Sequence, residues 1–177
     1  MPTLTPLDAV DPALLETHLD RCFGEERKAR TAYRIREGTQ QLAGLGFAAL
    51  DDEDYLAGTI QAWPIALHGR AGKAHPLVMV GPVAVASGYQ GEGYGKALMA
   101  ALLGAMDLPG APAPPQLLIG DPDYYGRWGF NADETAGWHC PGPVERERLL
   151  LRNPNRAPLL RDGMLGPWTA PDPATKD

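Results

Sequence analysis

The chain of 177 residues is 44% hydrophobic and 21% charged, with a formal net charge of -6. That length and composition are typical of one globular domain with a buried core, which we expect over residues 1–170, followed by a disordered tail at residues 171–177. The acidic balance argues against nucleic acid as a partner, and no apolar run reaches the ~20 residues that a membrane-spanning helix needs.

The start of the chain and its two cysteines exclude further classes of protein. Residues 1–6 contain neither the basic region nor the apolar core of a signal peptide. Cys22 and Cys140 have the spacing of neither a disulfide framework nor a metal site. We therefore expect a cytoplasmic protein that binds no metal and no membrane.

Two helices are predicted in the first 35 residues. Asp11 as N-cap and Pro12 at the first helical position begin an amphipathic helix, with His18 expected on its surface. A second helix is predicted over residues 25–35. Its basic side chains are expected to form a solvated face; they are Arg27, Lys28, Arg30 and Arg34.

A hairpin and a buried strand follow. Residues 45–50 and 55–67 are predicted to pair across the acidic turn 51–54, whose carboxylates we expect to be solubilising. The strand over residues 77–85 is apolar at nearly every position, so both of its faces should be covered. Because Pro82 cannot donate to a strand ladder, we expect this strand to be interrupted near its middle.

A glycine-rich loop, Gln90-Gly91-Glu92-Gly93-Tyr94-Gly95-Lys96, connects that strand to an apolar helix predicted over residues 97–106. The alternate glycines expose backbone N–H groups, and the first turn of the helix adds unpaired N–H groups and the positive end of its dipole. This arrangement binds anions, most often phosphate.

The spacing of the loop matches neither common nucleotide motif. A Walker loop, G-x-x-x-x-G-K-[ST], would need glycine at Gln90 and a hydroxyl at Ala97. The dinucleotide fingerprint, G-x-G-x-x-G, would need glycine at Lys96.

The rest of the chain alternates short elements. A proline-rich connector over residues 108–115 leads to a strand at 116–119. Asp121 as N-cap, followed by Pro122, begins a helix that runs to Trp128 and ends at Gly129. Further strands are predicted within residues 146–151 and 159–168.

Two motifs together resemble the GNAT superfamily of N-acetyltransferases. The Q-x-x-G-x-G pattern from Gln90 to Gly95 is similar to the acetyl-CoA pyrophosphate loop of that superfamily. The run Tyr124-Tyr125-Gly126-Arg127-Trp128-Gly129-Phe130 resembles the aromatic-Tyr-x-x-x-Gly-Phe run that closes its core, and it follows the loop after one helix and one strand, as in the family. Trp128 departs from the pattern, where phenylalanine or leucine is commoner. The resemblance covers residues 77–130, and the N-terminal third fits by element order.

The resemblance implies an α/β fold with a mixed, mostly antiparallel sheet flanked by helices. Two neighbouring parallel strands would splay apart to admit the pantetheine arm of the cofactor, and an interruption at Pro82 is compatible with that splay. The cofactor-binding residues implied by the family are Val83, Ala84 and Val85 toward pantetheine, and Gln90, Gly91, Glu92, Gly93, Tyr94, Gly95 and Lys96 at the pyrophosphate. Gln90 is expected to brace the loop, while Glu92 and Tyr94 point outward and contribute only their amides.

The implied reaction transfers an acetyl group from acetyl-CoA to a primary amine of a small molecule or peptide, by direct attack in a ternary complex. A backbone N–H near Ala84 or Val85 would stabilise the oxyanion. Tyr125 matches the family tyrosine near the coenzyme sulfur and is the candidate catalytic residue; its alternative role is that of a core aromatic. A phenol of pKa ~10 gives its proton uphill to a thiolate of pKa ~8.5, so Tyr125 need only hydrogen-bond the sulfur while the ammonium product supplies the proton.

Other features of the reaction stay open at this point. His68, His75 and His139 are candidate general bases, as are a carboxylate or a water chain. Asp121 and Asp123 are better explained by their positions at a helix N-terminus. A non-catalytic acyl-CoA-binding sensor or scaffold is the alternative function, and a homodimer is compatible with the sequence.

Overall fold

The fold is organised around an eight-stranded mixed sheet with strand order β1-β2-β3-β4-β5-β7, in which β8 pairs with both β3 and β6. The computed structural model describes residues 1–110 and 112–169, so the predicted tail at 171–177 lies outside the described residues. The strands are β1 (Thr3–Pro6), β2 (Phe47–Leu50), β3 (Leu56–His68), β4 (Ala74–Val85), β5 (Gln116–Ile119), β6 (Gly137–His139), β7 (Leu149–Arg152) and β8 (Asp162–Pro167). All pairs are antiparallel except β4–β5 and β6–β8.

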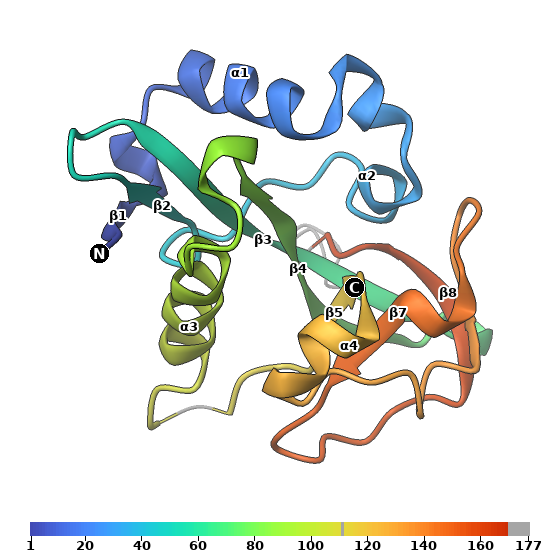
Figure 1. The fold of residues 1–177 in the computed structure, drawn as a ribbon. Helices are drawn as coiled ribbons and strands as arrows, with labels where there is room; N and C mark the ends of the chain where they lie inside the picture. The colour runs from blue at the N-terminus through green and yellow to red at the C-terminus, as the bar shows by residue number, and fades with distance from the viewer. Residues whose placement is uncertain (111, 170–177) are drawn as a thin grey trace, which may run out of the picture.

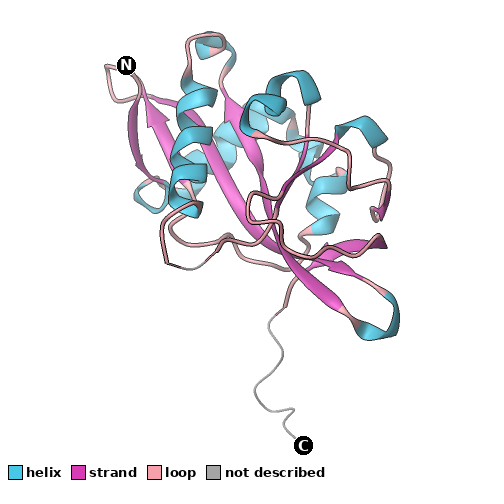
Figure 2. Ribbon diagram, turned by 90° about the horizontal axis from the view of Figure 1, so that it is seen from below, coloured by secondary structure: helices cyan, strands magenta, loops and turns pink. Residues whose placement is uncertain are grey.

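Helices cover both faces of this sheet (Figure 1 and Figure 2). The α-helices are α1 (Pro12–Phe23), α2 (Thr31–Ile35), α3 (Tyr94–Met106) and α4 (Pro122–Tyr125). Short 3-10 segments are η1 (Leu7–Ala9), η2 (Glu25–Ala29), η3 (Arg70–Gly72), η4 (Ser87–Tyr89), η5 (Gly126–Trp128) and η6 (Arg146–Arg148). Figure 1 shows α1 and α2 along one side of the sheet and α3 on the other. The predicted mixed α/β fold is confirmed.

Two apolar clusters hold the layers together. On the side of α3, Leu98 and Leu102 are buried against Ile60 of β3 and Val80 of β4. A second cluster gathers around Trp138 and includes Ile35, Ile65, Leu117 and Leu149. Among the described residues, no helix is both long and apolar enough to cross a membrane.

Cap residues set several helix boundaries as predicted. Ala13 N donates to Asp11 Oδ1 at 2.8 Å, and Asp123 N donates to Asp121 Oδ1 at 2.9 Å. Gly129 ends η5 in the left-handed conformation, with φ of 89°. The helix predicted from residue 97 starts earlier, at Tyr94, because Gly93 adopts the left-handed conformation (φ 89°) and serves as its N-cap.

The second predicted helix is divided into two elements. The 3-10 segment η2 ends at Ala29, and the extended backbone of Arg30 (ψ 151°) separates it from α2. Lys28, Arg30 and Arg34 are exposed, but the prediction of a solvated face was wrong for Arg27. Arg27 is only 2% exposed because it turns back toward α1 and bonds two carboxylates there.

Two short strands, β1 and β6, were not predicted. The hairpin over residues 45–67 is confirmed as β2 and β3, with Phe47 opposite Ile60. β1 adds to the free edge of β2, with Thr3 opposite Leu50. β6 has three residues and pairs with β8. Strands of three or four residues are too short to show a clear hydrophobic periodicity. Their pairing partners also lie far away in the chain, so the local sequence does not indicate them.

Candidate active site

The central feature of the site is the divergence of the parallel strands β4 and β5. Among the described residues they pair through Val78 with Gln116 and Met79 with Leu117, and the strand pairing ends there. On the other side of β4 the ladder with β3 shifts its register, because Ile60 faces Val83 while Ala62 faces Val80. Two residues of β4, Gly81 and Pro82, therefore stand opposite one residue of β3, which is a β-bulge. This confirms the predicted interruption at Pro82 and the predicted splay.

A cavity of about 480 Å³ lies between the separated strands and the segments packed over them. Its walls include residues 79–83 from β4 and residues 118–121 at the end of β5. A second cavity, of about 330 Å³, is bordered by the glycine-rich loop. Both cavities are lined by Phe23, Val83, Tyr124 and Tyr125, so they adjoin at these side chains.

The glycine-rich loop is at the second cavity, where the sequence predicts the pyrophosphate. Of the predicted cofactor-binding residues, those that line this cavity are Val83, Val85, Gln90, Gly91, Gly93, Tyr94, Gly95 and Lys96. Ala84 and Glu92 do not line either cavity. Gln90 Nε2 donates to Val85 O at 3.3 Å and so ties the loop to the end of β4.

Tyr94 corrects one detail of the loop. Its side chain is buried rather than directed outward, and its ring meets Tyr89 edge-on at 5.3 Å between centroids. The cause is the early start of α3, which puts Tyr94 one turn before Leu98 on the core face of the helix.

The acidic turn is structural as well as solubilising. Tyr89 Oη donates to Asp51 Oδ2 at 2.7 Å, while Asp51 Oδ1 accepts from Glu53 N and Tyr55 N. These hydrogen bonds lower the pKa of Asp51, and the bond from Tyr89 has the largest effect. The turn between β2 and β3 is thereby connected to the segment that leads into the glycine-rich loop.

Tyr125 lies where the two cavities meet, and the chain makes room for its ring. A Cβ on Gly120 would lie 2.5 Å from Tyr125 Cε2, so only glycine fits at that position. The ring packs edge-on against Tyr124 at 4.9 Å. Burial, and then the neighbouring Tyr124, raise the pKa of Tyr125 to about 12.

Tyr124 lines both cavities, although it is not among the predicted site residues. Its hydroxyl would lie 3.0 Å from a Cβ on Gly95, so it reaches the start of α3 from the opposite wall. Its position beside Tyr125 in the aromatic run was the available signal.

His18 was predicted at the helix surface, and this was wrong. The side chain is 6% exposed, because α1 lies against β4. Its Nε2 lies 3.1 Å from Ala84 O, and since a carbonyl only accepts, Nε2 carries the hydrogen. Burial, partly opposed by this hydrogen bond, lowers the pKa of His18. His18 therefore contacts the strand that the family resemblance assigns to pantetheine.

Acidification is expected to destabilise the fold through His18. Between its lowered pKa in the folded state and about 6.5 in the unfolded state, the unfolded chain binds more protons, so stability is present above that window and lost as the pH falls through it. Melting temperatures measured from about pH 7.5 to pH 5 should therefore fall less in His18→Gln, which keeps a donor near Ala84. Parallel curves for the two proteins would contradict this assignment.

None of the candidate histidine bases lines either cavity. His68 Nε2 lies 3.1 Å from Pro167 O, His75 is the second residue of β4, and His139 ends β6. Asp121 does line the larger cavity, but its carboxylate caps α4. Within the described residues, no group of three or more His, Cys, Asp or Glu side chains could hold a metal.

Comparisons with known proteins agree with this geometry. The sequence model of the Acetyltransferase (GNAT) family matches residues 13–113. A GNAT family N-acetyltransferase (YhbS) from Escherichia coli, solved with CoA, has a TM-score of 0.64 at 22% identity over 85% of this chain and 79% of its own. A GNAT family acetyltransferase from Brucella melitensis, solved with acetyl-CoA, has a TM-score of 0.58 at 20% identity over 92% and 93%. No curated protein is similar enough in sequence to count as a relative.

The two structural likenesses concern the fold, since their sequence identities are low. The family match covers more than half of the chain, including the bulged strand and the glycine-rich loop. The splayed strands, the loop at the start of α3 and this match lead to one conclusion: the chain belongs to the GNAT family of acetyltransferases.

Proposed function

We propose that this protein transfers an acetyl group from acetyl-CoA to a primary amine of a small molecule or peptide. The observation that carries the proposal is the meeting of two cavities at Tyr125. One is bordered by a loop suited to phosphate, and the other leaves room for an acceptor beside the separated strands. The CoA and acetyl-CoA complexes of the two similar structures support the same cofactor.

The loop residues suit an anionic cofactor despite the net charge of -6. Gly91 and Gly93 have positive φ (80° and 89°), which turns the chain tightly before α3. The α3 N-terminus directs the positive end of its dipole toward the loop, and Lys96 adds a cation at the cavity wall. Attraction for the cofactor is therefore local. Amides of residues 90–96 would bind the pyrophosphate, and those of residues 83–85 the pantetheine arm.

Residues of β4 and α4 would have different roles in catalysis. A backbone N–H of Ala84 or Val85 would stabilise the oxyanion formed when the amine attacks the thioester carbonyl. Tyr125 would hydrogen-bond the departing sulfur while remaining protonated. The ammonium formed on the acceptor would supply the proton that the thiolate takes up. This mechanism requires the acceptor and acetyl-CoA to be bound to the protein at the same time.

Cofactor binding is tested first by thermal shift with CoA, acetyl-CoA, ATP and NAD. A ligand at ~100 times its Kd stabilises by about 2.7 kcal/mol, a shift of several degrees. We expect a response to the CoA species, and a loss of ~10-fold or more in affinity in Gly95→Val, whose side chain meets the Tyr124 hydroxyl.

Gly104→Val is the matched control, because Gly104 lies in the same helix and a Cβ at that position would meet nothing within 4 Å. Equal losses of CoA affinity in both variants would mean that the glycine-rich loop does not contribute to cofactor binding. A response to CoA without thiol release from any amine would favour the non-catalytic sensor or scaffold.

A further inference from the structure

The larger cavity is lined by arginines, in contrast to the acidic chain as a whole. Four arginines border it, namely Arg27, Arg30, Arg36 and Arg148. Its one acidic lining residue is Asp121, whose carboxylate already accepts from Asp123 N. A cavity with this excess of cations would repel a polycationic amine and attract an anion.

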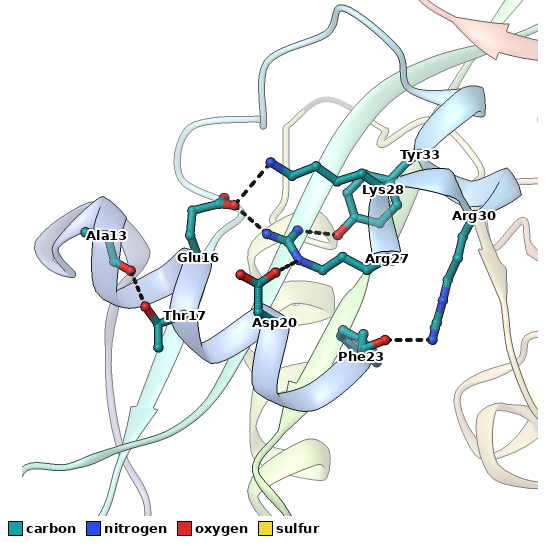
Figure 3. Close-up of polar contacts among 9 residues, drawn as sticks. All are labelled: Ala13, Glu16, Thr17, Asp20, Phe23, Arg27, Lys28, Arg30 and Tyr33. Atoms are coloured by element: carbon teal, nitrogen blue, oxygen red, sulfur yellow. Dashed lines mark hydrogen bonds and ion pairs between the residues drawn. The ribbon is translucent and has the colours of Figure 1, made fainter. Parts of the chain in front are cut away.

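Arg27 does not contribute free charge to the cavity. It donates to Asp20 Oδ1 at 2.8 Å and to Glu16, both on α1, and to the hydroxyl of Tyr33 at 2.6 Å (Figure 3). Its charge is thereby neutralised. Its structural effect is to hold Tyr33, which lies between Arg27 and Arg36.

Arg36 is the buried arginine of the cavity that forms no ion pair with a described carboxylate. Its side chain is 8% exposed, and its Cζ lies 3.6 Å from the Trp63 ring centroid and 4.1 Å from that of Tyr33. Across the described residues, no carboxylate lies within 4.0 Å of its guanidinium. Burial lowers the pKa of Arg36 to about 10, which leaves it charged at neutral pH. A buried cation without a counter-ion is costly, although the two rings offset part of that cost.

The position of Arg36 is fixed from both sides. Tyr33 is held by Arg27, and Trp63 Nε1 donates to Gly81 O at 2.7 Å. The guanidinium is therefore attached to the bulge of β4 through one ring and to α1 through the other. This is the preorganisation that a binding site needs, since the cation loses little freedom when a ligand arrives.

Two further arginines border the same cavity from different elements. Arg30, just before α2, donates to Phe23 O at 3.0 Å and is exposed. Arg148, at the end of η6, is close enough to Tyr125 to act on its pKa, which it lowers. Neither forms an ion pair with any described carboxylate. Arginine suits planar, bidentate binding of carboxylate or phosphate.

Resting on the proposed acetyltransferase function, we propose that the acceptor is an anionic amine: its carboxylate or phosphate binds Arg36, Arg30 and Arg148, and its amino group lies toward Tyr125. The glycine-rich loop lies at the other cavity, so the arginines would serve the acceptor and not the cofactor phosphates. The shared ligand chemistry is an amine and an oxyanion in one small molecule or at one peptide terminus.

Matched acceptor pairs test the proposal by thiol release. β-Alanine is compared with β-alaninamide, and O-phosphoethanolamine with ethanolamine, which separates carboxylate from phosphate. We expect at least one oxyanion-bearing member to exceed the partner that lacks the oxyanion ~10-fold or more in kcat/KM, as loss of a charged hydrogen-bond partner does elsewhere. Preference for the member that lacks the oxyanion in both pairs would overturn the proposal.

Variants then locate the contact. Arg36→Gln should raise the KM for the preferred anionic acceptor ~10-fold or more, with the KM for acetyl-CoA unchanged. Arg148→Gln and Arg30→Gln should also raise this KM. Because they change less buried side chains, they test the proposal even if Arg36→Gln fails to fold. Arg34→Gln is the control, because Arg34 is exposed, near Arg36 in sequence and outside the cavity lining. A raised KM for acetyl-CoA alone would assign the arginines to the cofactor and overturn the proposal.

Calorimetry of the same four compounds with the CoA-loaded protein gives a result that does not need turnover. Binding of an anionic compound that Arg36→Gln or Arg148→Gln abolishes would support the anion site even if no acetylation occurs, in which case the proposed function fails and the site stands. No binding and no turnover of either anionic compound would overturn the anion site, while a thermal response to CoA would leave the cofactor assignment intact.

Discussion

Removing the Tyr125 hydroxyl, as in Tyr125→Phe, is expected to lower kcat about 10- to 100-fold with little change in the KM for acetyl-CoA. The hydroxyl is proposed to donate to sulfur mainly in the transition state, when negative charge develops there. Its loss therefore affects the chemical step more than binding. Steady-state kinetics with thiol detection would measure both constants.

The raised pKa defines how Tyr125 can act. With a pKa of about 12, full transfer of its proton to a thiolate of pKa ~8.5 would be uphill by about 5 kcal/mol, more than an ordinary phenol would require. Tyr125 should therefore stay a hydrogen-bond donor, and kcat should show no decline caused by its ionisation below about pH 11.

Gly120→Ala provides an independent test, because it displaces the Tyr125 ring without changing it. The added Cβ would lie 2.5 Å from Cε2 of that ring, so kcat should fall in the same direction. Tyr55→Phe is the control, since Tyr55 is exposed and lines neither cavity. A Tyr125→Phe protein as active as Tyr55→Phe would leave Tyr125 only the role of a core aromatic.

Replacing Arg27 with methionine is expected to lower the free energy of unfolding by about 2 to 3 kcal/mol. Arg27 is 2% exposed and bonds Glu16, Asp20 and Tyr33 together. Loss of one partner of a fully buried ion pair costs about 3 to 5 kcal/mol. The loss here should be smaller, because Glu16 and Asp20 are 52% and 41% exposed and regain water. Methionine keeps the apolar stem.

Lys28→Met is the matched control for this prediction. Lys28 also lies near Glu16, at 3.5 Å, but is 69% exposed, so its removal should cost less than about 1 kcal/mol. Urea denaturation of the three proteins would measure the difference. Equal stabilities of the two variants would mean that the Arg27 network contributes no more than a surface ion pair.

Helix ends and the glycine-rich loop could be predicted because their causes are local. The Asp11 and Asp121 caps bond an amide two residues away, and Gly129 only needs a left-handed backbone. Pro82 predicted the interruption of β4 for the same reason, since it lacks an N–H group wherever it stands in a strand. The predicted start of α3 was about one turn too late, because the prediction placed both Gly93 and Gly95 in the loop.

The environments of charged side chains could not be predicted in this way. His18 is buried where its Nε2 donates to the carbonyl oxygen of Ala84, a residue that lies 66 positions further along the chain. Arg27 finds its carboxylates 7 and 11 residues back, across the turn that joins α1 to η2. In sequence, both resemble ordinary polar positions on an amphipathic helix.

The sequence alone predicted the family, through the glycine spacing of residues 90–96 and the aromatic run of residues 124–130, and the family match over residues 13–113 confirms it. These motifs act through backbone groups and neighbouring rings within one short segment. The tertiary structure alone decided which of the two buried arginines, Arg27 and Arg36, is paired with carboxylates. Arg27 is neutralised by α1, whereas Arg36 lies between Tyr33 and Trp63 at the cavity wall. The physical reason is that the charge environment of a side chain depends on the elements that folding brings against it.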